Sequence, residues 1–373
     1  MNSKAIVAGH ICIDITPVFP KERKESLANL FVPGKLINMN EADVHAGGPV
    51  PNTGLAMKMF GCEVRLIGKI GNDDFGGMVK EMFQRYGAAD ELIVSDNLST
   101  SYSIVIAPPG VDRIFLHHPG ANDLFVSNDI NENVLEDAAL FHFGYPPLMK
   151  SMYLNDGEEL IKLFKKVKSF GVATSLDFVA IDAESEAGRT DWMRILTGVL
   201  PYVDFFVPSA EELCFMLDRP RYNEWIERAN GADVTCILDI ENDIRPLAVK
   251  CTDMGAKILL LKCGAPGMFY KTASSKVIKD LSGRLNIDVQ DWCDREGFER
   301  SYIPDRVLSG TGAGDTTIAA FLAAMLKGYC FDECIRLASA TGASCVEAYD
   351  ALSGLKTFDD LERKIKNGWK KSY

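Results

Sequence analysis

Residues 308–326 read LSGTGAGDTTIAAFLAAML, a glycine-rich turn that leads directly into an apolar helix. Glycines in such a turn allow the backbone to approach a ligand closely. The N–H groups of Ala313, Gly314 and Asp315 should lie at the helix N-terminus, where the positive end of the helix dipole favours anions. The turn formed by these residues and Gly312 is therefore predicted to be an anion hole for a transferring phosphoryl group. Asp315, in the first helical turn, could accept a proton from an attacking alcohol.

A simpler interpretation of this segment is a capped helix behind a flexible glycine turn, with nothing bound. Two other nucleotide-binding patterns do not fit. A Walker P-loop requires Lys-Ser or Lys-Thr after the glycines, and neither follows here. A Rossmann site places its glycines after the first strand of a unit, whereas these lie late in the chain. An NAD-dependent oxidoreductase is therefore disfavoured.

The composition is that of an ordinary soluble protein, because 47% of the 373 residues are hydrophobic and 25% are charged. The net charge of -12 does not suit a nucleic-acid partner. The N-terminal apolar run ends at Asp14, too early for a signal peptide, and no stretch reaches the roughly 18 apolar residues of a membrane span. The ten cysteines include no Cys-x-x-Cys pair, which disfavours zinc. We expect a cytoplasmic protein without membrane or nucleic-acid partners.

Predicted strands and helices alternate along the chain, and several strands are continuous apolar runs. Such runs are typical of parallel strands buried on both faces. The expected strands are 4–8, 64–69, 139–143, 172–177, 204–207 and 257–262. The expected helices are 51–60, 75–86, 156–170, 210–217, 244–254, 313–326, 331–347 and 359–369. This pattern predicts an α/β fold with a central, mostly parallel sheet, and only the polar stretch 280–300 receives no assignment.

Two regions break this alternation. Residues 27–45 alternate apolar and polar positions with no helix after them, and residues 101–107 and 113–118 flank a Pro-Pro-Gly turn at 108–110. They predict a small antiparallel sheet with one solvated face. Such an insertion in a βαβ core suggests a lid over a site. Its exposed strands could pair with a second subunit, giving a homodimer.

Two separated motifs resemble the signatures of PfkB, or ribokinase-like, carbohydrate kinases. GTGAGD followed by a small-residue helix resembles the C-terminal signature. Residues 45–87 resemble the N-terminal one, with a Gly-Gly turn, an Asn, a helix, a strand and Gly-x-Asp-x-x-Gly. Further matches lie at 117–122, 207–212 and 264–267. The resemblance covers nearly the whole chain. It implies a single three-layer α/β/α domain over 1–373, a β lid from insertions at about 15–45 and 99–119, and a nucleotide-binding half at about 200–373.

The resemblance also implies an activity. It points to phosphorylation of a hydroxyl group on a sugar or related small molecule by ATP, with Mg²⁺ present and Asp315 as the general base. A monosaccharide is favoured over a nucleoside because sugar kinases dominate the family. A nucleoside kinase and a non-catalytic sugar- or nucleotide-binding regulator on the same fold remain alternatives.

The resemblance places the substrate near the N-terminal signature. Asp14, just after the first predicted strand, would hold substrate hydroxyls, since a carboxylate accepts two hydrogen bonds. The Gly47-Gly48 turn would let the chain pass close to the sugar. Asn52 would add a donor and an acceptor, although it could instead cap the following helix. Asn122 is expected in the same pocket, unless it is an ordinary turn residue.

The metal and nucleotide sites are expected in the second half of the chain. Glu212 matches the Glu of the family's Asn-x-x-Glu motif, which helps to organise Mg²⁺, but Ser209 replaces the Asn. Ser209 and Glu212 also have the spacing of a capping box, and both roles can coexist. The residues expected to bind the nucleotide are Ser209, Lys262, Gly264, Gly267, Thr311, Ala343 and Val346. Ser309 stands where the family usually has an Asp that helps to bind a monovalent cation, which leaves potassium activation open.

Overall fold

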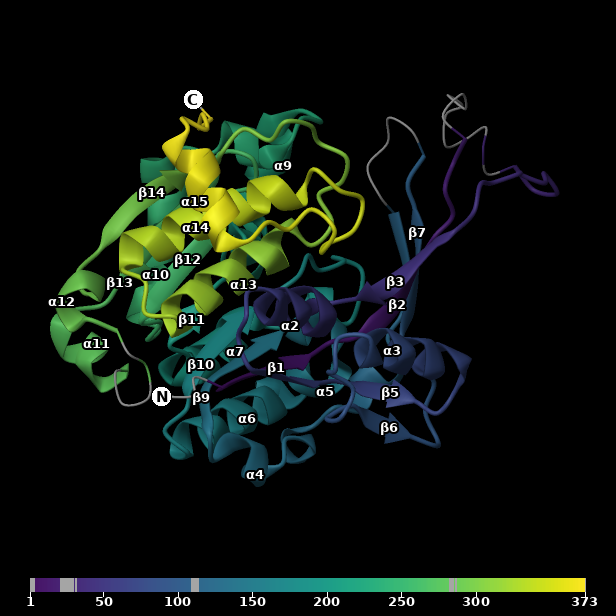
Figure 1. Cartoon of the computed structure of the whole chain (residues 1–373), viewed down its shortest axis with the longest axis horizontal. Helices are drawn as coiled ribbons and strands as arrows, with labels where there is room; N and C mark the ends of the chain where they lie inside the picture. Colours follow the sequence, from purple (N-terminus) through teal and green to yellow (C-terminus); the bar gives the residue numbers. More distant parts are fainter. Residues whose placement is uncertain are drawn as a thin grey trace.

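The structure is a computed structural model that describes residues 4–20, 30, 32–108, 114–281, 285 and 287–372. Parts of the sequence-based predictions lie outside these ranges. They are Pro109 and Gly110 of the predicted turn, Arg113 of the strand that follows it, and most of residues 27–31. The described residues form a central sheet with helices on both faces and a smaller sheet beside it (Figure 1).

The central sheet has eight strands in the order β14-β13-β12-β11-β10-β9-β1-β4. Their bounds are β14 Glu296–Arg300, β13 Gly267–Thr272, β12 Ile258–Lys262, β11 Phe205–Phe206, β10 Ala173–Asp177, β9 Ala138–Gly144, β1 Lys4–Gly9 and β4 Val64–Ile67. The strands from β4 to β12 run parallel, and β13 and β14 continue antiparallel. All of β9, AALFHFG, is buried, as a parallel strand covered on both faces requires. The predicted α/β sheet is confirmed.

Helices cover both faces of this sheet. They are α2 Pro49–Met59, α3 Asp74–Gln84, α4 Glu132–Leu135, α5 Lys150–Tyr153, α6 Glu158–Ser169, α7 Trp192–Val199, α8 Ala210–Leu217, α9 Arg219–Ala229, α10 Arg245–Asp253, α11 Ser275–Leu281, α12 Val289–Trp292, α13 Ala313–Leu326, α14 Phe331–Cys345 and α15 Phe358–Lys366. None of the helices in the described ranges has the length and apolar content needed to cross a bilayer.

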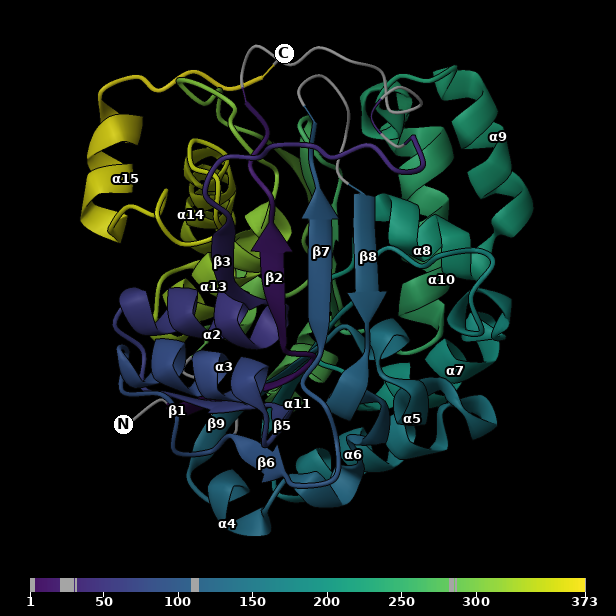
Figure 2. The same cartoon turned by 90° about the vertical axis from the view of Figure 1, so that its right-hand side faces the viewer.

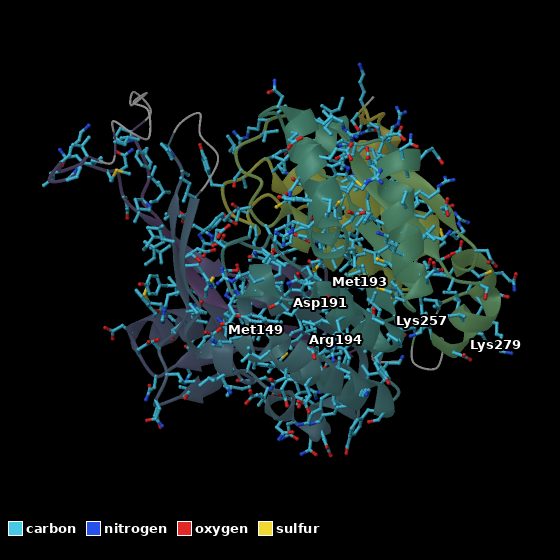
Figure 3. The ribbon with its side chains drawn as sticks, turned by 180° about the vertical axis from the view of Figure 1, so that it is seen from behind. Met149, Asp191, Met193, Arg194, Lys257 and Lys279 are labelled. Carbon is cyan, nitrogen blue, oxygen red and sulfur yellow. The ribbon has the colours of Figure 1, made fainter. Side chains whose placement is uncertain are left out.

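Alternate residues of each strand divide the core into two halves. In β12, Ile258 and Leu260 belong to the half that holds α2, α13 and α14, which lie side by side in Figure 1. Leu259 and Leu261 belong to the half that holds α6, α7, α8 and α10. Figure 3 views this second half from behind, with Met193 and Arg194 marking α7. Successive strand residues point to opposite faces, so one sheet supports two helical layers.

The smaller sheet differs in part from the prediction. Its order is β3-β2-β7-β8, and Figure 2 shows the four strands side by side. Their bounds are β3 Asp43–Gly47, β2 Cys12–Thr16, β7 Tyr102–Ile106 and β8 Ile114–His118. The two outer pairs are antiparallel, as predicted, but β2 and β7 are parallel. The prediction of strand structure within 27–45 is wrong for residues 32–42, which contain a turn at Pro33 and Gly34 and form no strand. The sequence analysis also missed β2.

The edge strand β8 exposes apolar side chains. Ile114, Phe115 and Leu116 have exposed fractions of 40%, 52% and 55%. Pairing of this edge with a second subunit stays a prediction.

The predicted strand 64–69 is in fact two strands. The chain leaves the central sheet at Gly68, where a Cβ atom would lie 2.7 Å from the side chain of Ile11. It then forms β5 (Lys69–Gly71), which pairs with β6 (Ile93–Ser95) in a separate two-stranded sheet.

An aromatic cluster ties α12, α13 and α14 to the central sheet. The ring centroid of Trp292 lies 6.4 Å from that of Phe205 in β11, 5.8 Å from Phe321 in α13 and 5.1 Å from Phe331 in α14. Trp292 is 1% exposed, so its whole side chain is removed from water. Such T-shaped pairs stabilise a core beyond the burial of their area.

We expect Trp292→Ala to lower the free energy of unfolding by about 3–5 kcal/mol, because it leaves a cavity between three elements. Urea denaturation followed by circular dichroism measures this loss. Tyr349→Ala, at a side chain that is 65% exposed, is the control and should change stability by less than about 0.5 kcal/mol. Equal losses for the two variants would contradict the described packing.

Candidate active site

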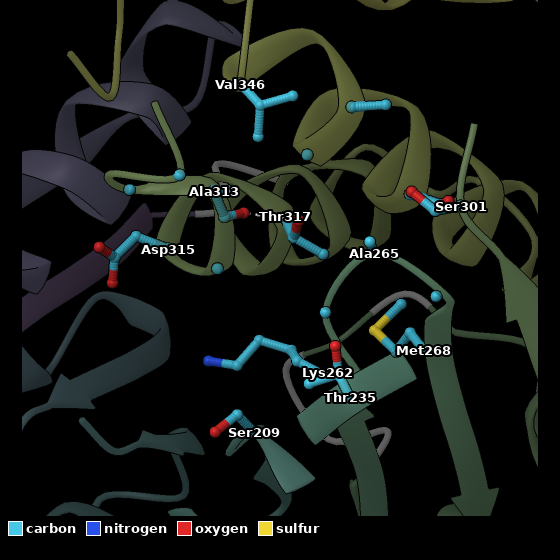
Figure 4. A pocket seen from close by; sticks show the side chains of 18 of the residues that line it. Ser209, Thr235, Lys262, Ala265, Met268, Ser301, Ala313, Asp315, Thr317 and Val346 are labelled. Atoms are coloured by element: carbon cyan, nitrogen blue, oxygen red, sulfur yellow. Dashed lines mark hydrogen bonds between the residues drawn. The ribbon is translucent and has the colours of Figure 1, made fainter. Parts of the chain in front are cut away.

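A cleft of about 740 Å³ opens at the carboxyl ends of the parallel strands. Tyr145, Phe178, Ser209 and Lys262 line it, and they lie at or just after the ends of β9, β10, β11 and β12. The carboxyl ends of parallel strands meet at one edge of a sheet, which is where open α/β proteins bind their ligands. Figure 4 shows α13 on the opposite side of the cleft from Ser209 and Lys262.

The cleft brings together most of the residues that were predicted to bind nucleotide, phosphate or metal. Those that line it are Ser209, Glu212, Lys262, Gly264, Gly267, Gly312, Ala313, Gly314, Asp315, Ala343 and Val346. Thr311 is not a lining residue, and its hydroxyl and amide are instead hydrogen-bonded to the Ser309 hydroxyl at 2.9 and 3.1 Å. The predicted substrate residues lie outside the cleft wall, on β2, at the end of β3, at the start of α2 and in the short 3-10 helix Gly120–Leu124 after β8.

The N-terminus of α13 presents backbone amides to the cleft. Gly312 is the N-cap residue, with a left-handed φ of 70° that favours glycine, and no side chain caps this end. The first amides of a helix have no intrahelical acceptor, and the helix dipole makes their surroundings positive. Gly314 lies beside Lys262, since a Cβ atom at position 314 would be in ordinary contact with the Lys262 ammonium nitrogen at 3.5 Å.

Asp315 is held by two side chains from distant parts of the chain. Its carboxylate is 3% exposed. Asn52 donates from Nδ2 to Oδ2 at 2.9 Å, and the Tyr145 hydroxyl lies 2.8 and 2.9 Å from the two carboxylate oxygens. Burial raises the pKa of Asp315, whereas the bonds from Asn52 and Tyr145 and the charge of Lys262 oppose that rise. The result is an oriented carboxylate that is a stronger base than an exposed Asp.

Packing of α2 against α13 places Asn52 beside this carboxylate. The helix begins at Pro49 with Gly48 as its N-cap, so the interpretation of Asn52 as a cap is wrong. The neighbouring Thr53 donates from its hydroxyl to the backbone oxygen of Asp315 at 3.4 Å. Both residues are buried, and together they fix the first turn of α13 from outside.

A second buried carboxylate compensates the cation of the cleft. Lys262 lies 2.7 Å from Oδ1 of Asp177, which is 1% exposed and ends β10. Burial alone would lower the pKa of Lys262, but the carboxylates of Asp177 and Glu212 raise it. Burial raises the pKa of Asp177, and Lys262 counteracts this rise. Figure 4 shows Lys262 extending from the end of β12 toward the side of the cleft that holds Asp315.

The capping box at the start of α8 is confirmed. The Ser209 hydroxyl accepts from the Glu212 amide at 3.2 Å, and Oε2 of Glu212 accepts from the Ser209 amide at 2.7 Å. This pair fixes the Glu212 carboxylate at the wall of the cleft. In the described residues, no group of three or more His, Cys, Asp or Glu side chains could by itself enclose a metal ion.

Asp14 lies on β2, opposite the Gly-Gly turn. Its Oδ1 accepts from the Cys12 thiol at 3.3 Å, and its Oδ2 lies 3.8 Å from Nε2 of His45. Burial raises the pKa of Asp14, and the side chains of His45, Cys12 and Ser103 oppose this rise. A side chain at Gly47 would collide with this carboxylate, so the glycine is required for the close approach of β3.

Asn122 has a different role from the predicted one. It is fully buried, and its amide group exchanges hydrogen bonds with the backbone of Ile11 at 2.9 and 3.2 Å and donates to Pro119 at 3.1 Å. It therefore fixes the connection between β1 and β2, which carries Asp14, and its amide is not available to a ligand.

The sequence analysis missed Tyr145 and Asp177. Tyr145 follows β9 directly and has a left-handed φ of 65°, which turns its hydroxyl toward α13. Asp177 is the last residue of β10. Both could have been found, because polar residues at the carboxyl ends of predicted parallel strands are candidates for the site.

Comparison with known proteins gives a consistent result. A sugar kinase of Archaeoglobus fulgidus is 23% identical over 305 residues, which are 81% of this chain and 98% of that protein. The structure of Arabidopsis thaliana ribokinase has a TM-score of 0.70 with 21% identity and covers 98% of this chain and 99% of its own. A structure from Escherichia coli has a TM-score of 0.68 with 20% identity and the same coverage. These structures establish the ribokinase-like fold.

The family model described as pfkB family carbohydrate kinase matches residues 4–357, which include both signature motifs and the whole cleft apart from Ser372. The chain belongs to the pfkB family and is a carbohydrate kinase.

Proposed function

We propose that this kinase transfers the γ-phosphoryl group of ATP to a hydroxyl group of a sugar or related small molecule, with Asp315 as the general base. The observation that carries the proposal is the position of Asp315. Its carboxylate is buried and bound by Asn52 and Tyr145, directly beside the first-turn amides of α13. A base and an anion site in contact are what phosphoryl transfer to an alcohol needs.

The relatives support both ATP as the phosphoryl donor and a sugar as the acceptor. The Arabidopsis thaliana ribokinase was solved with ribose and ATP, and the Escherichia coli structure contains ATP and Mg²⁺. Other relatives are named fructokinase, and one structure of the same fold is an archaeal nucleoside kinase. The sugar is therefore favoured as a class, and the individual acceptor is left to experiment.

The cleft fits a nucleotide. Its volume of about 740 Å³ is in the range of small-molecule sites. Gly264 and Gly267 on one side and Ala343 and Val346 on the other would border the base and ribose. The amide of Gly314 and the ammonium of Lys262 would hold the terminal phosphate, together with the Ala313 amide, which here makes a 3.3 Å bond to the Gly310 oxygen that the phosphate would replace. The ion pair with the buried Asp177 leaves Lys262 with only a partial excess of positive charge.

Glu212 fits a magnesium ion that is bound mainly by water and phosphate. One carboxylate at the cleft wall is enough for that mode of binding, because Mg²⁺ keeps several waters. When bound, the ion would neutralise negative charge on the phosphates. Ser209 is committed to the capping box, which limits it to a supporting role.

The reaction follows from the placement of these groups. The acceptor hydroxyl lies between Asp315 and the terminal phosphate, and Asp14 holds other hydroxyls of the acceptor. The hydroxyl oxygen forms a bond to phosphorus as the bond from phosphorus to the ADP oxygen breaks, and its proton passes to Asp315. Tyr145 and Asn52 keep the carboxylate ionised and oriented, and the α13 amides stabilise the charge on the transferring group.

Asp315→Asn should lower kcat by at least about 10²–10⁴-fold, because an amide cannot accept the proton. ATP binding, measured by isothermal titration, should persist. The measurement is ADP release with a panel of sugars and nucleosides in the presence of Mg²⁺.

Asp74→Asn is a matched control, since Asp74 is an exposed Asp in the first turn of α3. It should keep wild-type turnover. Full activity of Asp315→Asn would rule out the proposed base, and ligand binding by the wild type without turnover of any acceptor would rule out the kinase function.

Tyr145→Phe should move the acid limb of the pH–kcat profile to higher pH. Activity needs ionised Asp315, so it falls as pH drops through the pKa of that carboxyl, which burial has already raised. Removing the Tyr145 hydroxyl takes away a donor that favours the charged form and raises this pKa further. An acid limb that does not move would show that Tyr145 does not stabilise the base. ATP affinity serves as the control and should stay constant.

Glu212→Gln should raise the Mg²⁺ concentration for half-maximal activity by about tenfold while keeping the fold. Glutamine can still close the capping box through its side-chain oxygen but has no charge for the metal. Glu333→Gln, in the capping box of α14, is the matched control and should leave the Mg²⁺ dependence unchanged. An unchanged Mg²⁺ requirement in Glu212→Gln would remove Glu212 from the metal site.

A further inference from the structure

Two histidines, His10 buried and His117 half-buried, lie between Asp315 and Asp14 without a function in the mechanism above. His10 follows β1 directly and is 2% exposed. His117, on β8, faces it with a centroid separation of 5.1 Å. On its other side, the ring of His10 lies 6.3 Å from that of Tyr145, whose hydroxyl contacts Asp315.

The same line of polar groups continues to Asp14. Nδ1 of His117 lies 3.1 Å from the Ser103 hydroxyl. Ser103 is the register partner of Asp14 across β2 and β7, and its side chain opposes the rise that burial causes in the pKa of that carboxyl. The two imidazoles therefore connect the catalytic carboxylate with the carboxylate that would hold the acceptor.

Three ring nitrogens of this pair lack hydrogen-bond partners among the described residues. They are both nitrogens of His10 and Nε2 of His117. Buried polar atoms without partners are destabilising and rare in folded proteins. A Cβ atom at position 48 would lie 2.7 Å from both Nδ1 and the carbonyl oxygen of His10, so Gly48 allows the backbone to pack directly against this ring. Unused donors and acceptors that only Tyr145 separates from the Asp315 carboxylate are suited to a bound ligand.

Charge limits what that ligand can be. Burial lowers the pKa of His10 far below its ordinary value and that of His117 to about 4, so both rings are neutral at physiological pH. A neutral imidazole offers one donor and one acceptor, which matches a hydroxyl group, itself both donor and acceptor. Asp14 and Asp315 at the two ends of the line would repel an anionic group. In the described ranges no Lys or Arg forms an ion pair with Asp14.

We propose that His10 and His117 determine acceptor specificity by hydrogen-bonding hydroxyl groups of an uncharged polyhydroxy acceptor, and that they select against phosphorylated and carboxylate-bearing acceptors. The inference rests on the proposed phosphoryl transfer and adds to it the residues that choose the acceptor. Asp14 would hold the far hydroxyls, and the histidines would fix the hydroxyls nearest the one that reacts.

The test compares His10→Phe and His117→Phe with the wild type, because phenylalanine keeps the ring and removes the nitrogens. The acceptors are D-fructose, D-ribose, D-gluconate, fructose 6-phosphate and adenosine. ADP release gives KM and kcat, and isothermal titration gives acceptor binding without turnover. The wild type should prefer an uncharged sugar. Each variant should raise the acceptor KM about tenfold or more while the KM for ATP stays unchanged.

Two further variants control this test. His10→Gln retains a donor and an acceptor and should recover part of the acceptor affinity. His118→Phe alters the next residue of β8, whose Nε2 bonds to Ser99, and should leave the acceptor KM unchanged. Thermal unfolding of each variant shows that the fold is intact.

The outcomes separate the two proposals. If a sugar binds in a way that depends on His10 but no acceptor is phosphorylated, the specificity inference stands and the proposed catalysis fails. An unchanged acceptor KM and binding constant in both Phe variants overturns the inference, and so does a preference of the wild type for fructose 6-phosphate or gluconate.

Discussion

The buried carboxylate of Asp315 is the constraint on which the rest of the site depends. A charge removed from water is costly unless other groups solvate it, and Asn52, Tyr145 and Lys262 supply that solvation here. The three residues come from different parts of the fold: Asn52 lies on α2, Tyr145 directly follows β9, and Lys262 ends β12. The positions of these elements are therefore fixed not only by apolar packing but also by the need to surround one oxygen pair.

The same reasoning explains how charge is distributed across the cleft. Lys262 would leave a strong positive charge near α13, yet its ion pair with Asp177 reduces that excess before any ligand arrives. In the proposed nucleotide site the donors would be mostly backbone amides, which are fixed by the helix and do not need to reorganise. Where we propose that the acceptor binds, the pattern reverses, with the carboxylates of Asp14 and Asp315 at the two ends and the rings of His10 and His117 between them.

Much of the fold could be predicted from the sequence because the parallel strands are continuous apolar runs. The helix 313–326 and the helix 210–217 have the predicted bounds, and the strand 172–177 differs by one residue. The smaller sheet was predicted less well. Its strands are short and half-exposed, so alternation over residues 27–45 could not distinguish a paired strand from an extended loop, and only long-range pairing with β7 selects β2.

The candidate site also contains residues that local sequence could predict and residues that it could not. Residues within the glycine-rich turn and the capping box could be found from local sequence, because their geometry is set by neighbours along the chain. Tyr145 and Asp177 are marked in the sequence only as polar residues at the ends of apolar strands, and their roles come from distances to α13 and β12 that arise only on folding. Asn122 matched a motif, yet its buried amide serves the backbone, which the motif alone does not reveal.

The bond between Asn52 and Asp315 joins residues that are 263 positions apart in the chain. The Asp315 carboxylate thus gains its orientation only when the last third of the polypeptide docks on the first sixth. Contacts of such large sequence separation form late in folding, because the intervening chain must be ordered first. The orientation of the Asp315 carboxylate therefore depends on the docking of α2 on α13, and a substitution that loosens this helix pair should disturb the carboxylate without touching either residue.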